Sequence, residues 1–296
     1  MSTSTQAKRQ AFNPAAEIAT MERLISKYSV TDIPPTPLSE TTGTKLDFAS
    51  SSPQGVFKPV AFITGTTGNL GSYLLSSLLC SDKVTKLYAF NRRGSGSIRQ
   101  RHVAALQDKG LDVKVLDDKR LILLEGDLSK DNFGLDPKIY EQLRINVTLF
   151  LHVAWPVNWM APLSQFEQSI HGTSNLIRFA KTSPNASHLR FFFTSSISSC
   201  VSFRDDGYIT EDALCSPKDA LGMGYGQAKY IVDRILANSG LRNASTLRIG
   251  QLSGCQNTGV WSPFEWIPVI IRSSVSLGCF PFNPGVRSKR ISWQCV

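Results

Sequence analysis

Residues 60–72 read VAFITGTTGNLGS, and this stretch decides how the rest of the chain folds. Residues 60–64 have the apolar composition of a buried strand, and residues 70–79 carry apolar side chains at helical spacing. Three glycines follow the strand in a G-x-x-G-x-x-G pattern, and the last of them lies within the helix. A strand, a glycine-rich turn and a helix in this order are typical of a dinucleotide-binding loop, because the helix N-terminus presents backbone N–H groups to a pyrophosphate.

Each glycine has an expected role in such a loop. Gly65 would permit the tight turn that leaves the strand, and Gly68 would let the backbone approach the pyrophosphate. Gly71 would let the helix pack closely on the sheet. Glycines also mark ordinary turns, so the prediction depends on the strand before them and the helix after them.

Size and composition predict an ordinary globular protein. The chain has 296 residues, of which 42% are hydrophobic and 19% charged, and it can bury a sizeable core. No apolar run reaches the roughly 20 residues that span a bilayer. The net charge of +9 comes from scattered Lys and Arg residues, which fits attraction to a phosphorylated cofactor or an acidic carrier domain. Nothing besides this charge supports nucleic-acid binding.

The cysteines and histidines predict no metal site. The six cysteines form no C-x-x-C pair, and four histidines are too few to complete a zinc pattern. We therefore expect free thiols in a reducing compartment, the cytoplasm. The first 16 residues lack acids and carry Lys8 and Arg9, but the few arginines and the lack of a clear amphipathic stripe favour a disordered tail over a transit peptide.

Residues 1–56 are expected to precede the main folded domain. Their composition predicts a disordered tail, a short amphipathic helix over residues 15–28 and a Pro-rich linker over residues 31–54. The apolar stripe of this helix would dock on the domain that follows or on a neighbouring domain.

Strand and helix patterns alternate between residues 57 and 250. The predicted strands are residues 60–64, 86–91, 121–125, 147–152, 189–194 and 245–249. The predicted helices are residues 70–79, 97–109, 137–144, 166–181 and 223–238. Such alternation predicts an α/β fold, a Rossmann-type doubly wound parallel sheet. Residues 251–296, rich in Pro, Trp and Ser, would build a smaller substrate-facing lobe.

The end of the second strand decides which cofactor is expected. An acid there would bond the ribose 2′-hydroxyl of NAD, whereas an arginine accommodates the 2′-phosphate of NADP. The chain has Arg92 and Arg93 and no acid at this point, so we expect NADPH; two solvated surface arginines are the alternative. Asp127, after the third strand, would frame an adenine or cap a helix.

Three further residues form a candidate catalytic group. Tyr225 and Lys229 share one face of a predicted helix, with about 5–6 Å between their Cβ atoms. The lysine ammonium would lower the pKa of the phenol towards the range of proton transfer; a plain surface helix is the alternative for such a pair alone. The fifth strand ends in hydroxyl residues, which can stabilise a substrate carbonyl oxygen. Ser196 is the predicted residue there, and Ser195 and Thr194 are the alternatives.

Together these motifs resemble the extended short-chain dehydrogenase/reductase superfamily. The resemblance rests on TGTTGNLG at residues 64–71, GDL at 126–128, the hydroxyl-rich strand end and the Y-x-x-x-K pair. Residues 151–159 (LHVAWPVNW), 247–254 (LRIGQLSG) and 261–281 are similar to segments of thioester reductase domains, which are related to male-sterility-type fatty acyl reductases. Residues 261–281 look like the start of the substrate lobe of this family, particularly in fungal adenylate-forming reductases, and the family resemblance covers about residues 57–293.

The resemblance implies an activity. Domains of this family use NADPH to reduce an acyl thioester, bound to the phosphopantetheine arm of a carrier protein or to CoA, to an aldehyde and sometimes to an alcohol. It implies that Ser196 and Tyr225 hold the carbonyl oxygen, that Tyr225 supplies the proton, and that Lys229 tunes Tyr225 and anchors the ribose. Trp155 and Trp159 would shape the acyl tunnel or simply pack in the core.

The cofactor-binding residues expected from the motifs and the resemblance are Gly65, Thr67, Gly68, Asn69, Leu70, Gly71, Arg92, Arg93, Asp127, Leu128, Ala154, Trp155, Tyr225 and Lys229. Pro156 would also border the nicotinamide ribose.

Two alternatives stay open beside the thioester reductase. One is a reductase of a free small carbonyl compound on the same scaffold, and the other is a non-catalytic NADP-binding sensor. The WPVN segment at residues 155–158 argues against nucleotide-sugar epimerases. The family normally continues past residues 291–293 with further helices, so the substrate lobe is expected to be incomplete. The sequence leaves the acyl group and the oligomeric state open.

Overall fold

Six parallel strands form the centre of the structure, a computed structural model that describes residues 13–33, 58–204, 209, 211, 215–256 and 258–280. The strands are β1 (Val60–Thr64), β2 (Lys86–Arg92), β3 (Leu121–Gly126), β4 (Leu149–His152), β5 (Arg190–Ser196) and β6 (Ala244–Ile249). They lie in the order β3-β2-β1-β4-β5-β6, and all neighbours are parallel. The predicted doubly wound sheet is confirmed, with small shifts at the strand ends. The direction in which strands are added reverses between β1 and β4, where ligands bind in such sheets.

The two faces of the sheet carry different side chains, because successive residues of a strand point to opposite faces. One face is aromatic, with the buried residues Phe62, Tyr88, Phe90, Phe150, Phe191 and Phe193. The other face is small and aliphatic, with Ala61, Ile63, Leu87 and Ala89. Both faces are apolar, which is the pattern of a parallel sheet covered on both sides.

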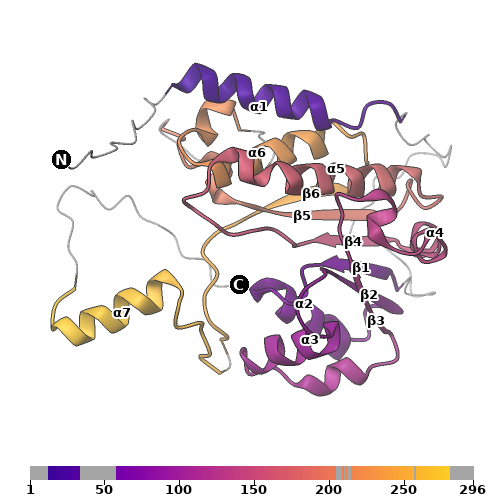
Figure 1. The fold of residues 1–296 in the computed structure, drawn as a ribbon, viewed down its shortest axis with the longest axis horizontal. Helices are drawn as coiled ribbons and strands as arrows, with labels where there is room; N and C mark the ends of the chain where they lie inside the picture. The colour runs from indigo at the N-terminus through magenta and orange to yellow at the C-terminus, as the bar shows by residue number, and fades with distance from the viewer. Residues whose placement is uncertain are drawn as a thin grey trace, which may run out of the picture.

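Helices cover both faces of the sheet (Figure 1). The aliphatic face packs against α2 (Asn69–Cys80) and α3 (Ile98–Gln107), and the aromatic face packs against α4 (Pro137–Asn146), α5 (Glu167–Thr182) and α6 (Gly224–Ala237). Short 3-10 helices lie in the connections: η1 (Val113–Asp117), η2 (Asp131–Gly134), η3 (Leu163–Phe166), η4 (Ile197–Cys200) and η5 (Pro217–Ala220).

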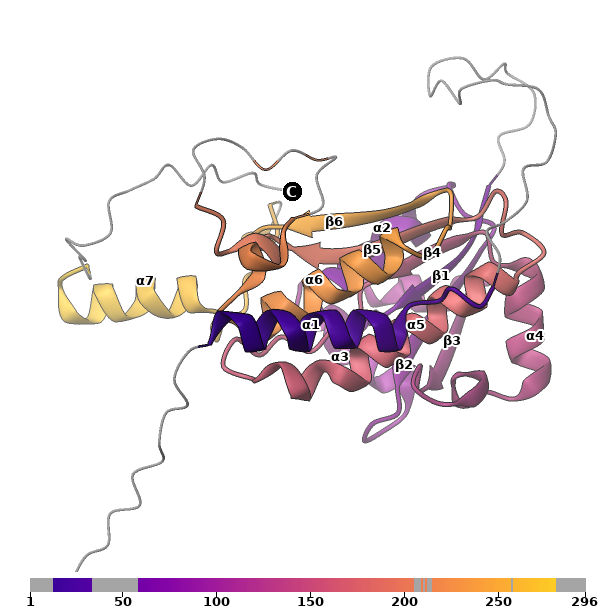
Figure 2. The same cartoon turned by 90° about the horizontal axis from the view of Figure 1, so that it is seen from above.

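The N-terminal helix α1 (Pro14–Tyr28) packs on this domain. Met21 and Leu24 are buried in the aromatic-side core, and Figure 2 shows α1 lying along α5 and α6. The chain after α1 is held by Lys181, whose ammonium donates to the carbonyl oxygens of Val30 and Ile33 at 3.1 and 2.7 Å. Of the two expected docking places for this helix, the structure shows the one on the chain's own domain.

After β6 the chain forms one more helix, α7 (Trp266–Leu277), which the sequence patterns did not predict. None of its residues is buried, and in Figures 1 and 2 it projects away from the sheet. Residues 1–12 of the expected tail (1–14), residues 34–54 of the expected linker (31–54), residues 55–57 and the last 16 residues of the chain (281–296) lie outside the described residues. Within the part that is described, no helix combines the length and the hydrophobicity needed to cross a membrane.

Candidate active site

The glycine loop follows β1 at the point where the strand order reverses. Gly65 has a φ of +76°, and a Cβ built on it would lie 2.7 Å from the Cα of Ala154, which follows β4. A Cβ on Gly71 would lie 2.1 Å from the carbonyl oxygen of Gly65. Both positions therefore need glycine for the fold itself, one for the turn and one for the approach of α2 to that turn.

Gly68 differs from the other two glycines. A Cβ there would meet only the carbonyl oxygen of Gly65, at 3.2 Å. Gly68 is also the N-cap of α2, and no side chain caps the helix at this end. The first N–H groups and the positive dipole end of α2 are thus available to an anion. This cradle fits the pyrophosphate of a dinucleotide, which we expect to approach Gly68.

The loop is fixed to β2 and α3 by buried polar contacts. The Asn91 amide group donates to the Thr66 hydroxyl at 2.7 Å, and its carbonyl oxygen accepts the N–H of Thr67 at 3.2 Å. The Thr66 hydroxyl lies 2.8 Å from Nε2 of His102, whose Nδ1 lies 2.8 Å from the carbonyl oxygen of Ile98. His102 therefore donates through Nδ1 and accepts at Nε2, and burial lowers its pKa so that it stays neutral.

A second buried histidine joins β1 to β4. The Thr64 hydroxyl accepts the backbone N–H groups of Val153 and Ala154, both at 3.0 Å, and lies 2.8 Å from Nδ1 of His152. Nε2 of His152 lies 2.8 Å from the hydroxyl of Thr173. Burial lowers the pKa of His152 to about 3, so the ring is neutral. These contacts fix the segment after β4 beside the glycine loop.

Tyr225 and Lys229 are both buried at the start of α6, with exposed fractions of 7% and 2%. The Lys229 ammonium donates to the carbonyl oxygen of Thr194 at 2.6 Å. It also lies over the rings of Trp155 and Phe193, 4.4 and 4.6 Å from their centroids, and 5.7 Å from that of Tyr225. The predicted pair therefore does share one face of a helix, and this face is directed into the protein rather than to solvent.

The predicted lowering of the Tyr225 pKa is not observed. Burial raises this pKa above its ordinary value, and a hydrogen bond with Ser196 opposes the rise. Burial also lowers the pKa of Lys229 to about 7, and the negative charge of Asp233 opposes this lowering. The ammonium attracts a phenolate, and this attraction was the basis of the prediction. The desolvation of both buried groups has the larger effect on the two pKa values.

The structure distinguishes the three hydroxyl candidates at the end of β5. Ser196 contacts Tyr225 and also donates to the hydroxyl of Ser198 at 3.1 Å. Ser195 donates to the carboxylate of Asp233 at 2.8 Å, and Thr194 donates to the carbonyl oxygen of His152 at 3.1 Å. Ser196 is therefore the one of the three that lies beside the phenol.

The two tryptophans after β4 have different surroundings. Trp155 is packed between Phe166 and Phe193, with ring centroids 6.3 and 5.7 Å away. Trp159 is about half exposed, at 49%, and its ring centroid lies 5.0 Å from that of Tyr225. Trp155 thus packs against the Lys229 ammonium, and the more exposed Trp159 lies beside the Tyr225 ring.

The residues expected at the adenine end lie along the ends of β2 and β3. Arg92 and Arg93 are exposed, and Arg93 donates to the carbonyl oxygen of Gly134 at 3.4 Å. Asp127 accepts both the backbone N–H and the hydroxyl of Ser129, at 2.9 and 2.7 Å, so it caps the turn after β3. Leu128 packs against α5, where a Cβ on Gly172 would lie 2.9 Å from it.

Sequence reasoning missed Thr64, Asn91, His152 and Asp233 as parts of the site. A sequence feature could have identified the first three, because each is a polar residue at the carboxyl end of an otherwise apolar strand. Asp233 lies one helical turn after Lys229, at the same spacing as the predicted Tyr225–Lys229 pair.

The strand order and the glycine loop define a Rossmann-type α/β scaffold, on which Ser196, Tyr225 and Lys229 lie close together. The chain belongs to the male sterility protein family of NAD-binding domains, whose family model matches residues 63–294. The resemblance found in the sequence is thereby confirmed.

The relatives of this chain include fungal adenylate-forming reductases. The chain is 43% identical over 238 residues to the adenylate-forming reductase Nps11 of Serpula lacrymans, and 40% identical over 263 residues to Nps9 of the same fungus. These matches cover 79% and 88% of this chain but 21% and 23% of the relatives. The chain thus spans about a fifth of the length of these relatives.

Solved structures with the same fold include two reductase domains. The terminal R domain from the myxalamid PKS-NRPS biosynthetic pathway superposes with a TM-score of 0.70 at 20% identity, covering 90% of this chain and 64% of that one. The R domain of a nonribosomal peptide synthetase from Mycobacterium tuberculosis gives a TM-score of 0.61 at 21% identity, covering 86% and 60%. At these identities the likeness shows the shared fold.

Proposed function

We propose that this chain is an NADPH-dependent reductase of an acyl thioester, carried on a phosphopantetheine arm or on CoA, with an aldehyde or alcohol as the product. The observation that carries the proposal is the contact of Ser196 with Tyr225 beside Lys229, next to the glycine loop. Its relatives, the adenylate-forming reductases, support the thioester as substrate.

The residues that would hold the cofactor come from three places. The loop from Gly65 to Gly71 and the N-terminus of α2 would bind the pyrophosphate, and Lys229 would bind the nicotinamide ribose. Arg92 and Arg93 would bind the 2′-phosphate, which is the reason to propose NADPH. The acid opposite Asn91 in the β2–β3 register is Glu125, and it is paired with Arg101. Because its carboxylate is engaged in this pair, it supports the choice of NADPH over NAD. Bound NADPH would supply a hydride to the substrate carbonyl carbon.

The chain's own residues would orient the carbonyl and supply the proton. The Ser196 and Tyr225 hydroxyls would donate hydrogen bonds to the carbonyl oxygen as negative charge develops on it. Because burial raises the pKa of Tyr225, the phenol stays protonated at neutral pH and can act as a general acid. Trp155 and Phe193 would keep water away from the Lys229 ammonium.

The same proposal includes the partner of the protein and its cellular compartment. The domain would act on a thioester presented by a carrier domain, and the net charge of +9 would favour an acidic carrier. None of the five cysteines that the structure describes is in a disulfide, which supports the reducing environment of the cytoplasm.

The test is NADPH oxidation by the purified chain with a panel of acyl-CoA and acyl-pantetheine thioesters. We expect turnover with NADPH, little with NADH, and loss of turnover in Tyr225→Phe with NADPH binding retained. Turnover with free aldehydes but with no thioester would replace the proposal by a small-carbonyl reductase. Tight NADPH binding without oxidation under any condition would identify a cofactor-binding sensor.

A further inference from the structure

Asp233 is a buried acid on the helix that carries Tyr225 and Lys229. It follows Lys229 by one helical turn, and its exposed fraction is 6%. One carboxylate oxygen, Oδ2, accepts the Ser195 hydroxyl at 2.8 Å. The other, Oδ1, is buried and has no hydrogen-bond partner in the described part of the chain. A buried, half-satisfied carboxylate costs folding free energy, so its presence behind a catalytic group points to a functional reason.

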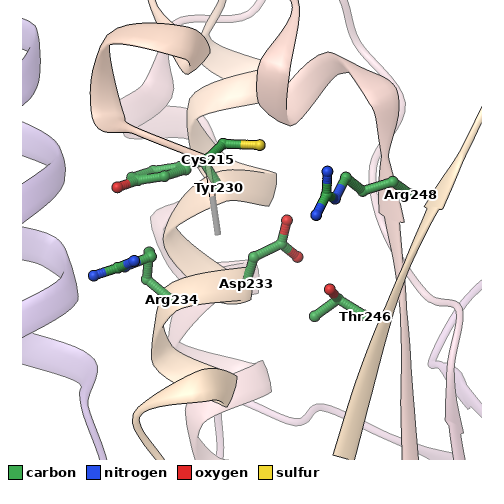
Figure 3. A pocket seen from close by; sticks show the side chains of 6 residues that line it. All are labelled: Cys215, Tyr230, Asp233, Arg234, Thr246 and Arg248. Carbon is green, nitrogen blue, oxygen red and sulfur yellow. The ribbon is translucent and has the colours of Figure 1, made fainter. Parts of the chain in front are cut away.

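The surroundings of Asp233 bring positive charge to it from two elements. Figure 3 shows its side chain directed from α6 towards β6, where Arg248 and Thr246 line the same small pocket. Burial raises the pKa of Asp233 to about 7, whereas the hydrogen bond from Ser195 and the positive charges of Lys229 and Arg248 favour the ionised carboxylate. The other titratable side chains that line the pocket are Cys215, Tyr230 and Arg234.

Apart from Asp233, few groups stabilise the positive charge of Lys229 in the described part of the chain. Its ammonium has the carbonyl oxygen of Thr194 as acceptor and the rings of Trp155 and Phe193 around it. His152, the titratable group that faces it from β4, is neutral. The charge that opposes the loss of the Lys229 proton is that of Asp233. The two groups therefore support each other's ionisation in a site that would otherwise neutralise both.

We propose that Asp233 is a positioning residue that keeps Lys229 protonated, and that it thereby sets the upper pH limit at which Tyr225 and Lys229 can work together. The effect on the pH profile of activity rests on the proposed function, whereas the effect of Asp233 on the protonation of Lys229 does not depend on it. The same carboxylate also ties the end of β5 to α6 through Ser195.

The test separates the charge of Asp233 from its shape. Asp233→Asn keeps the size of the side chain and an oxygen that can accept the Ser195 hydroxyl, but removes the charge. The pKa of Lys229 is read by NMR of protein labelled at the lysine ε-carbon, with the resonance assigned by Lys229→Arg. Removing an opposite charge one turn away is expected to lower this pKa by about one unit. The alkaline limb of the kcat/KM profile should move down by the same amount.

Two further variants control the experiment. Asp233→Glu restores a carboxylate and should return the Lys229 pKa and the alkaline limb towards the wild-type values. Asp82→Asn removes one exposed charge, paired with Lys58, and should leave both unchanged. Thermal unfolding of each variant checks that it is folded, and Asp233→Ser, which also removes the charge, tests the inference if Asp233→Asn does not fold.

The outcomes distinguish this inference from the proposed function. An unchanged Lys229 pKa in folded Asp233→Asn would overturn the inference and leave Asp233 a structural link to Ser195. A lowered Lys229 pKa in a protein that reduces no thioester would support the electrostatic role while the proposed function fails. A lowered pKa with an unmoved kinetic limb in an active enzyme would show that Lys229 protonation does not limit turnover, which contradicts the inference.

Discussion

The Thr64 hydroxyl at the end of β1 and Nδ1 of His152 at the end of β4 lie 2.8 Å apart. They join the two strands between which the sheet reverses its order. Because Thr64 Oγ1 already accepts the N–H groups of Val153 and Ala154, its own proton points to Nδ1, and His152 carries its proton on Nε2, directed to Thr173. The position of Ala154 against the Gly65 turn therefore depends on a neutral imidazole.

This dependence predicts a loss of stability in acid. The pKa of His152 is about 3 in the folded protein and about 6.5 in an unfolded chain. As the pH falls below the higher value, the unfolded chain takes up a proton that the folded protein refuses, so the stability that is present above about pH 6.5 is lost towards pH 3. The free energy of unfolding should fall by up to about 1.4 kcal/mol per pH unit in this window. Denaturant unfolding at a series of pH values measures this slope.

His152→Gln is the control for the acid effect. Glutamine does not titrate, so this variant should be less stable than the wild type at neutral pH but should show a shallower decline in acid. The buried His102 contributes to the decline in both proteins, because burial lowers its pKa as well. Equal slopes in the two proteins would mean that His152 is not the group that takes up the proton.

Two alanine substitutions in the glycine loop, Gly71→Ala and Gly68→Ala, are expected to have different effects. In Gly71→Ala the new Cβ would lie 2.1 Å from a backbone oxygen, so α2 must move and we expect a loss of at least about 1–3 kcal/mol of stability. In Gly68→Ala the nearest atom would be 3.2 Å away, and we expect a folded protein with greatly weakened NADPH binding. Thermal unfolding and titration of NADPH fluorescence separate the two effects. An unimpaired affinity in Gly68→Ala would move the pyrophosphate away from this residue.

The structural roles of Gly65 and Gly71 could be predicted from the sequence, whereas the Thr64–His152 contact could not. A glycine role follows from residues adjacent in the chain, and so does the Tyr225–Lys229 face of α6. Thr64 and His152 meet only because β4 pairs with β1, and that follows from the strand order. The pKa of Tyr225 was mispredicted for the same kind of reason, since burial depends on packing from other elements. The sequence patterns did not predict α7, a helix with no buried residue.

Arg92 and Arg93, at the end of β2, predict the choice of cofactor. Arg92→Ser should weaken NADPH binding by roughly tenfold or more, since a charge-assisted hydrogen bond to phosphate contributes about 1.5–3 kcal/mol. NADH binding should change little. Arg93→Ser should have a smaller effect, because Arg93 already donates to the carbonyl oxygen of Gly134. Fluorescence titration with both nucleotides measures the ratio of affinities. If Arg92→Ser weakens NADH and NADPH equally, this residue does not read the 2′-phosphate.

A final prediction concerns the contact between the glycine loop and the segment that leads into α7. The Glu265 carboxylate, at the N-cap of α7, accepts hydrogen bonds from the Asn69 amide at 3.1 Å and from the Trp261 indole at 3.0 Å. Asn69 is the first residue of α2, so this carboxylate places a negative charge at the helix end where the pyrophosphate is expected. Two anions near one helix N-terminus repel each other and compete for the same donors.

We therefore expect Glu265→Gln to bind NADPH more tightly than the wild type, by roughly threefold, because glutamine carries no charge while its one carbonyl oxygen still accepts one of the two hydrogen bonds. The gain should shrink as salt is added, since the repulsion is partly exposed to solvent and screened. Glu141→Gln, which removes an exposed acid paired with Arg144 on α4, should leave the affinity unchanged. Weaker binding by Glu265→Gln would mean instead that the carboxylate orients Asn69 for the cofactor, and that this orientation outweighs the repulsion.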